Sequence, residues 1–114
     1  MNEKSYRGFR IDGSGAHVYV YEQRPSGETQ YTYRLKAASS DIYESFDWGR
    51  DSPGCQRLAE AILMDLSGDC EWSKTRIPVL ATDWLAIIQE DSFRMTGTQI
   101  MSWLRANEGK AVSL

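Results

Sequence analysis

The stretch from Phe46 to Gly54 concentrates the residue types that could do chemistry. It reads Phe-Asp-Trp-Gly-Arg-Asp-Ser-Pro-Gly, so two carboxylates flank one arginine within a few residues. Asp47 and Asp51 could act as an acid–base pair. Alternatively, Arg50 and the backbone N–H groups at a helix start could hold a phosphate or another anion. The two carboxylates would compete for those donors, so a helix cap at Asp51 or Ser52 with Arg50 paired to an aspartate is the third interpretation.

Most other catalytic patterns are missing. The single histidine, His17, excludes the usual His-rich metal centres, and Cys55 and Cys70 do not have zinc-site spacing. The chain also contains no Walker-type phosphate loop, dinucleotide fingerprint or nucleophile elbow. We therefore predict a protein that is not an enzyme and that carries no metal or cofactor.

The composition is that of an ordinary globular domain. The chain has 114 residues, of which 41% are hydrophobic and 25% charged, enough for one domain with its own core. No apolar run approaches the roughly 20 residues that a membrane helix needs, so we expect a cytoplasmic protein that does not enter a membrane. A helix over residues 53–67 would hold Cys55 and Cys70 about 20 Å apart, too far for a disulfide, so we expect two free thiols.

The charge distribution points to a partner. The net charge is −3, but residues 1–36 carry +2 and residues 41–71 carry −6. An acidic half repels nucleic acid and suits a basic protein surface, so we predict a protein partner and no direct nucleic-acid binding. A solvated acidic helix surface is the plainer alternative. The residues predicted to face the partner are Asp41, Glu44, Asp65, Asp69 and Glu71.

The first third of the chain has the pattern of strands. Residues 6–11, 17–22 and 30–36 are rich in β-branched and aromatic residues and are separated by glycine-containing turns. Alternation places two sets of side chains on separate faces: His17, Tyr19 and Tyr21 on one, and Tyr31, Tyr33 and Leu35 on the other. A tyrosine face beside arginines could stack bases. The absence of an RNA-binding signature and the acidic total charge favour a face that is only half exposed to water.

Helix signals follow. Ser52, Pro53 and Gly68 bound an apolar stripe over residues 53–67, and Thr96 with Gln99 forms a capping box for a helix near the end. Between them we expect residues 77–80 to be extended or to form a broken turn, and we expect a helix capped by Thr82 over residues 83–89. The prediction is an α+β fold, with a three-stranded antiparallel β-meander followed by three α-helices packed on the sheet. It forms one domain over residues 1–114, with the sheet over about 4–36, the helical part over about 52–106 and a frayed C-terminal tail.

Several of these motifs resemble the domain of unknown function 6166 family. The resemblance spans about residues 6–104. The family's glycine-rich run before the first helix is replaced here by the shorter, charged segment 49–54. The matching segments are Tyr6-Arg7-Gly8, Phe46-Asp47-Trp48-Gly49, Ser52-Pro53-Gly54, Leu58-Ala59, Ala61-Ile62-Leu63, Phe93-Arg94-Met95-Thr96 and Ile100-Met101-Ser102-Trp103-Leu104.

The resemblance implies a lineage rather than an activity, because the family has none assigned. Its spread through bacteria, archaea and their viruses implies an accessory protein of a phage or another mobile element. We therefore expect a non-enzymatic protein-interaction module, one form of which is an anti-CRISPR-like inhibitor that binds a basic surface of a host defence complex, such as a nucleic-acid-binding subunit. The alternative is a protein that binds a small anion or nucleotide through Asp47, Arg50, Asp51 and Ser52. A structural or oligomer-forming role is the third possibility, and the sequence does not fix the oligomeric state.

Overall fold

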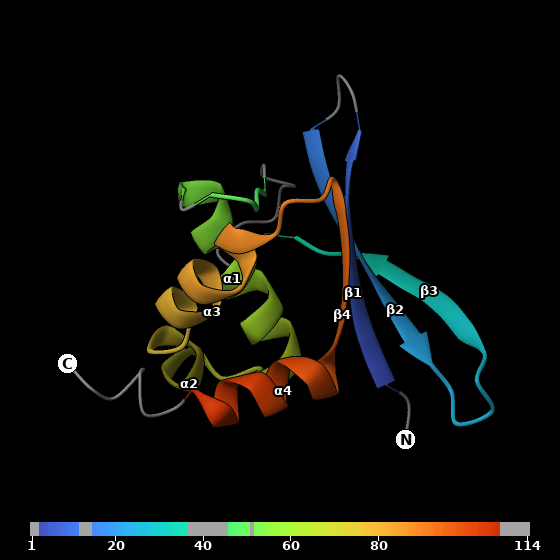
Figure 1. The fold of residues 1–114 in the computed structure, drawn as a ribbon. Helices are drawn as coiled ribbons and strands as arrows, with labels where there is room; N and C mark the ends of the chain where they lie inside the picture. The colour runs from blue at the N-terminus through green and yellow to red at the C-terminus, as the bar shows by residue number, and fades with distance from the viewer. Residues whose placement is uncertain (1–2, 12–14, 37–45, 51, 108–114) are drawn as a thin grey trace.

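A four-stranded antiparallel sheet is the centre of the fold (Figure 1). The computed structural model describes residues 3–11, 15–36, 46–50 and 52–107. The strand order is β3-β2-β1-β4, so β1 and β2 are central and β3 and β4 are edges. The strands are β1 (Glu3–Ile11), β2 (Gly15–Gln23), β3 (Thr29–Arg34) and β4 (Ser92–Thr96).

The fourth strand corrects the predicted three-stranded sheet, although the α+β class is confirmed. β4 pairs with β1, with Gly8 opposite Phe93 and Tyr6 opposite Met95. A side chain at Gly8 would collide with the Phe93 ring, because a Cβ there would lie 2.2 Å from the ring carbon Cε2. Glycine at this position therefore lets the ring pack flat against β1.

The first and last helices begin where the capping signals predicted. The Ser52 side chain accepts a hydrogen bond from the Cys55 N–H at the start of α1 (Pro53–Ser67), and Gly68 ends that helix with φ of 66°. Thr96 and Gln99 form the expected capping box at the start of α4 (Gly97–Ala106). The frayed tail predicted after the last helix lies outside the described residues.

The middle of the chain differs from the prediction. Residues 77–80, expected to be extended or a broken turn, instead open the helix α3 (Ile77–Asp83). The following segment is only the short 3₁₀ helix η1 (Leu85–Ile87). Thr82 therefore lies inside a helix rather than capping one. The proline at position 78 falls in the first turn of α3, where a missing N–H costs nothing. The five-residue helix α2 (Cys70–Lys74) precedes α3.

A register shift in the sheet corrects the predicted tyrosine faces. Val20 pairs with Tyr33 but Tyr21 pairs with Tyr31, so Thr32 is an extra residue in β3. Because of this bulge, Tyr31 lies with Tyr21 on one face while Tyr33 lies on the opposite face with Val20. The predicted grouping of Tyr31 with Tyr33 is therefore wrong.

The described helices all pack on one side of the sheet (Figure 1). The core lies between that inner side and the helices, and no described helix is long and apolar enough to cross a membrane. The inner side contributes fully buried side chains from three strands, and α1 contributes its apolar stripe. The core residues include Tyr6, Val18, Val20, Met95, Leu58, Ile62, Leu63, Leu80, Leu85 and Ile100.

Candidate functional site

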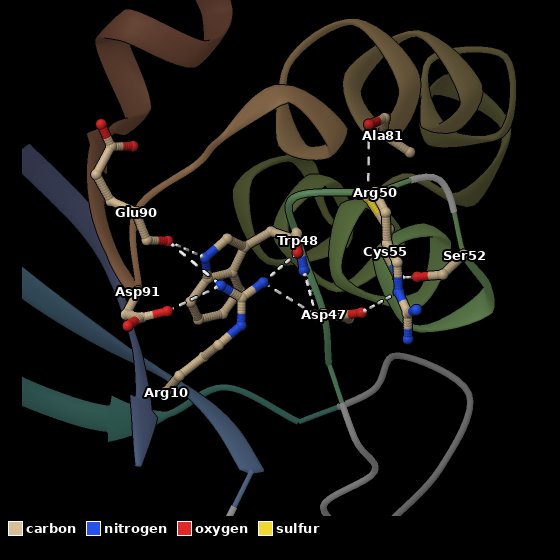
Figure 2. A network of polar contacts seen from close by, with 9 residues as sticks. All are labelled: Arg10, Asp47, Trp48, Arg50, Ser52, Cys55, Ala81, Glu90 and Asp91. Atoms are coloured by element: carbon tan, nitrogen blue, oxygen red, sulfur yellow. Dashed lines mark hydrogen bonds and ion pairs between the residues drawn. The ribbon is translucent and has the colours of Figure 1, made fainter. Parts of the chain in front are cut away.

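The loop predicted to carry chemistry is anchored by Arg10 and Trp48 (Figure 2). The Trp48 ring is 1% exposed, and its Nε1 donates to the Glu90 carbonyl at 3.0 Å. The Arg10 guanidinium stacks over that ring at 4.6 Å from its centroid. It also donates to the Trp48 carbonyl and bridges Asp47 at 3.2 Å and Asp91 at 3.4 Å. β1 and the segment before β4 thus hold this loop in place.

The Asp47 carboxylate is bonded to several groups around the loop and is not a free acid. One carboxylate oxygen accepts from Arg10 and from the Trp48 N–H, and the other accepts from Arg50 at 3.2 Å. Burial alone would raise the pKa of Asp47, but these hydrogen bonds outweigh burial and lower it. A carboxylate kept ionised by two arginines is poorly suited to act as a general acid or base near neutral pH.

The start of α1 has few free N–H donors for an anion. Pro53 has no N–H, and the Cys55 N–H is already bonded to Ser52 Oγ at 3.2 Å. Arg50 points toward Asp47 (Figure 2). The structure therefore brings Asp47, Arg50 and Ser52 together, as predicted, but in the arrangement of a helix entry with an internal ion pair. Asp51, the fourth predicted ligand residue, lies outside the described residues.

The two cysteines differ in burial. Cys55 is buried in α1 and its Sγ donates to the Ala81 carbonyl at 3.5 Å, whereas Cys70 is exposed. Both thiols are free. Within the described ranges, no three histidine, cysteine or acidic side chains gather as they would around a metal ion.

The predicted acidic face is not assembled as expected. Asp65, predicted to point outward, has a side chain only 15% exposed and forms an ion pair with Lys4 at 3.2 Å. The hydroxyls of Tyr6 and Tyr33 also donate to its two carboxylate oxygens, the Tyr6 contact measuring 2.5 Å. We call these four residues the Asp65 cluster. The prediction for Asp65 is wrong because residues 61 and 32 positions away in the sequence, on β1 and β3, reach it.

The Asp65 cluster shifts the titration of its own members. Burial and the hydrogen bond to Asp65 raise the pKa of Tyr6 and of Tyr33. Partial burial would lower the pKa of Lys4, but its contacts with Tyr33 and Asp65 raise it overall. All three donors are therefore held in their protonated forms, and the cluster joins α1 to two strands of the sheet.

Two of the other predicted acidic residues lie together at the start of α2. Asp69 and Glu71 are exposed at the start of α2, where the Asp69 side chain caps the helix by accepting from the Trp72 N–H. Asp41 and Glu44 lie outside the described residues. Of the three predicted residues that the structure describes, two are therefore exposed and one, Asp65, is enclosed.

The sheet side that the described helices leave uncovered is the larger feature. Phe9 is 39% and Tyr31 52% exposed there, a high value for large rings. The rings form a connected row, with centroid distances of 6.2 Å for Phe9–Tyr19, 6.1 Å for Tyr19–Tyr31 and 5.7 Å for Tyr21–Tyr31. We call this surface the outer face; it consists of Arg7, Phe9, His17, Tyr19, Tyr21, Tyr31, Arg34 and Arg94.

Arginines lie among these rings. The Arg7 guanidinium stacks over the Tyr21 ring at 4.3 Å, and Arg34 contacts His17 Nδ1 at 2.6 Å. Arginine can only donate, so this histidine nitrogen is an acceptor. Arg7 and Arg94 face each other across β1 and β4, and neither forms an ion pair with a described carboxylate. Like charges directly opposite each other destabilise a sheet, so a negatively charged group placed beside this pair would reduce the repulsion between them.

The lineage follows from comparison with known families. A family described as "Family of unknown function (DUF6166)" matches residues 6–106. The chain belongs to this family. The matched range covers the helices, the loop around Trp48 and the sheet except for the first three residues of β1, so of the features above only Lys4 of the Asp65 cluster lies outside it. No curated protein and no solved structure matches the chain.

Membership in DUF6166 confirms the resemblance read from the sequence but assigns no activity. The sequence placed His17, Tyr19 and Tyr21 of the outer face together but left out its other members for a local reason. Reading β3 without a bulge places Tyr31 on the inner side, and β4, which carries Arg94, was not predicted at all. The alternation of Ser92, Arg94 and Thr96 with Phe93 and Met95 was the available signal for that strand.

Proposed function

We propose that this protein is a non-enzymatic interaction module whose outer face binds a macromolecular partner that carries negative charge. The observation that carries the proposal is the composition of that face, where a row of aromatic rings, two of them exposed, lies beside two arginines that lack a described acidic partner. Glu3 is the only acidic strand residue on the same side, and its carboxylate is bonded to Thr98. The polar groups around Asp47 bond to each other, and those around Asp65 form a second, separate set. This supports a binding role rather than catalysis.

We place this function in a phage or another mobile element acting against host defence, with an anti-CRISPR inhibitor as one form. A defence complex that carries guide RNA offers the negative charge that the outer face would meet. The family match gives the lineage and leaves this biological setting to experiment. Expression of the chain should then raise phage plating on a host with active CRISPR defence. Unchanged plating would remove the anti-defence setting but not the binding role.

The binding role is tested by affinity capture from host lysate with three baits. The wild type should recover a partner that the outer-face double variant Tyr31→Ala, Arg94→Gln does not. The matched control, Asp69→Asn with Glu71→Gln, removes two exposed charges on the helical side and keeps a capping group at Asp69. It should recover the same partner as the wild type. If only the control variant loses the partner, the acidic side predicted from the sequence is the binding surface and the proposal is wrong.

A further inference from the structure

We infer that the ligand of the outer face is single-stranded nucleic acid. This inference rests on the proposed function, because it names the chemical class of the partner of the same surface. An acidic protein would bind the arginines but would offer no matching group for the aromatic rings. Single-stranded nucleic acid offers two complementary groups at once, phosphates for the arginines and flat bases for the rings. The outer face presents both kinds of partner within one surface.

The aromatic row fits base stacking. Four rings from three adjacent strands lie in the order Phe9, Tyr19, Tyr31 and Tyr21, with neighbouring centroids 5.7 to 6.2 Å apart. Phe9 at one end of the row and Tyr31 within it are the exposed rings. The rings belong to strands rather than loops, so their spacing is held by the sheet. Sheet-borne aromatics on the open side of a four-stranded antiparallel sheet form a known type of stacking platform for unpaired bases.

The arginines fit a phosphate backbone. Arg7 and Arg94 face each other beside the aromatic row, and Arg34 lies opposite Tyr19 at the other side of it. The Arg7 Nε atom is buried and has no hydrogen-bond partner among the described residues. Because that atom is buried, a phosphate would meet the rest of the guanidinium, where it would offset the repulsion between Arg7 and Arg94. A nucleic-acid ligand departs from the expectation, based on the net charge of −3, of no direct nucleic-acid binding. The charge is unevenly distributed: residues 1–36, which include the first three strands, carry +2, whereas residues 41–71 carry −6.

A duplex suits this face less well. Its bases are already stacked and paired, so the exposed rings would meet the phosphate backbone and could not stack on bases. We therefore expect single strands to bind at least tenfold more tightly than a duplex of the same sequence. RNA and DNA single strands share the recognised chemistry, and a comparison of the two distinguishes them as the source.

The test is fluorescence anisotropy with labelled oligonucleotides of about 15 nucleotides. It uses single-stranded RNA, single-stranded DNA, the duplex and, as an acidic polypeptide, polyglutamate as a competitor. Tyr31→Ala should weaken single-strand binding roughly tenfold or more, while the matched control Ile87→Ala, which removes an exposed apolar side chain from η1, should leave it unchanged. Circular dichroism checks that each variant is folded.

The salt dependence tests the arginines separately. Three arginine–phosphate contacts give a slope of log affinity against log salt of about −2, since each contact on a single strand contributes about −0.7. Arg94→Gln should reduce the magnitude of the slope by about 0.7, Arg94→Lys should keep it, and Arg105→Gln on α4 should not change it.

Three results would overturn the inference: no binding to any oligonucleotide, equal affinity for duplex and single strand with no effect of Tyr31→Ala, or displacement by polyglutamate at matched charge. If lysate capture still depends on the outer face in those cases, the proposed function stands and only the ligand class is wrong. If capture does not depend on that face either, both fail.

Discussion

Removing the carboxylate of Asp65 should destabilise the fold by an amount that can be estimated from its contacts. The carboxylate accepts from the Tyr6 hydroxyl at 2.5 Å, from Lys4 at 3.2 Å and from the Tyr33 hydroxyl. Tyr6 is fully buried, so leaving its hydroxyl without an acceptor costs about 2 kcal/mol. Tyr33 and Lys4 are partly exposed and water can replace their acceptor, so they add about 1 kcal/mol together.

We therefore expect Asp65→Ala to lower the free energy of unfolding by about 3 kcal/mol, which is a fall of roughly 10–20 °C in Tm for a domain of this size. Asp65→Asn should cost about 2 kcal/mol, because its amide oxygen can still accept from one hydroxyl while its NH₂ group cannot accept. Tyr33→Phe should cost about 1 kcal/mol, and the exposed control Glu71→Ala less than about 0.5 kcal/mol.

The measurement is urea unfolding followed by circular dichroism, with Tyr33→Phe and Asp65→Asn combined in a double-mutant cycle. A coupling free energy of about 0.5–1 kcal/mol is expected, since both changes remove one shared hydrogen bond. An Asp65→Ala variant within about 0.5 kcal/mol of wild type would refute the reasoning. Asp65 would then be a surface acid after all, as the sequence suggested.

Four further predictions concern the Asp65 cluster, Asp47, Gly49 and the thiols. Tyr6, Tyr33 and Lys4 have raised pKa values in the folded protein, so the stability that they contribute is fully present below about pH 10 and is lost as pH rises further. The urea midpoint should therefore fall as pH rises past about 10, and Asp65→Asn should make that fall smaller. At acidic pH the lowered pKa of Asp47 matters instead. The stability that this carboxylate contributes is present above its ordinary pKa of 3.8 and is lost as pH falls below that value, so Asp47→Asn should remove this part of acid unfolding. Gly49→Ala should cost about 2 kcal/mol by the same unfolding assay, because Gly49 has φ of 87° and an added Cβ would lie 2.9 Å from the Ile88 carbonyl oxygen. Alkylation without reductant should label only the exposed Cys70 in the native protein and both thiols after denaturation, and a pair that stays unlabelled in denaturant would reveal a disulfide.

The features that the sequence predicted well are local. The cap of α1 needs only Ser52, Pro53 and Gly68, and the capping box of α4 needs only Thr96 and Gln99. These residues act on backbone groups within a few positions of themselves, so their effect can be read without knowledge of the rest of the chain.

The features that it missed depend on distant partners. β4 exists because it pairs with β1 almost ninety positions earlier, and five residues in isolation do not form a strand. The side of the sheet on which Tyr31 lies depends on a bulge, and a shift of one residue reverses every side chain beyond it. Asp65 was assigned to the surface because its helix position lies off the apolar stripe, whereas Lys4 and two tyrosines from the sheet enclose it.

The two sides of the sheet give a way to separate stability from binding. The inner side is attached to the helices through the Asp65 cluster and to the loop through Arg10 and Trp48, whereas the outer face contributes little to either attachment. Asp65→Asn should therefore weaken the fold but leave single-strand affinity within about twofold, provided that binding is measured well below the unfolding midpoint. Tyr31→Ala should do the reverse, since a ring 52% exposed contributes little to the core. If Asp65→Asn weakens binding while circular dichroism is unchanged, the cluster must also position the outer face. The route would be β3, in which Tyr33 of the cluster lies directly before Arg34 of the outer face.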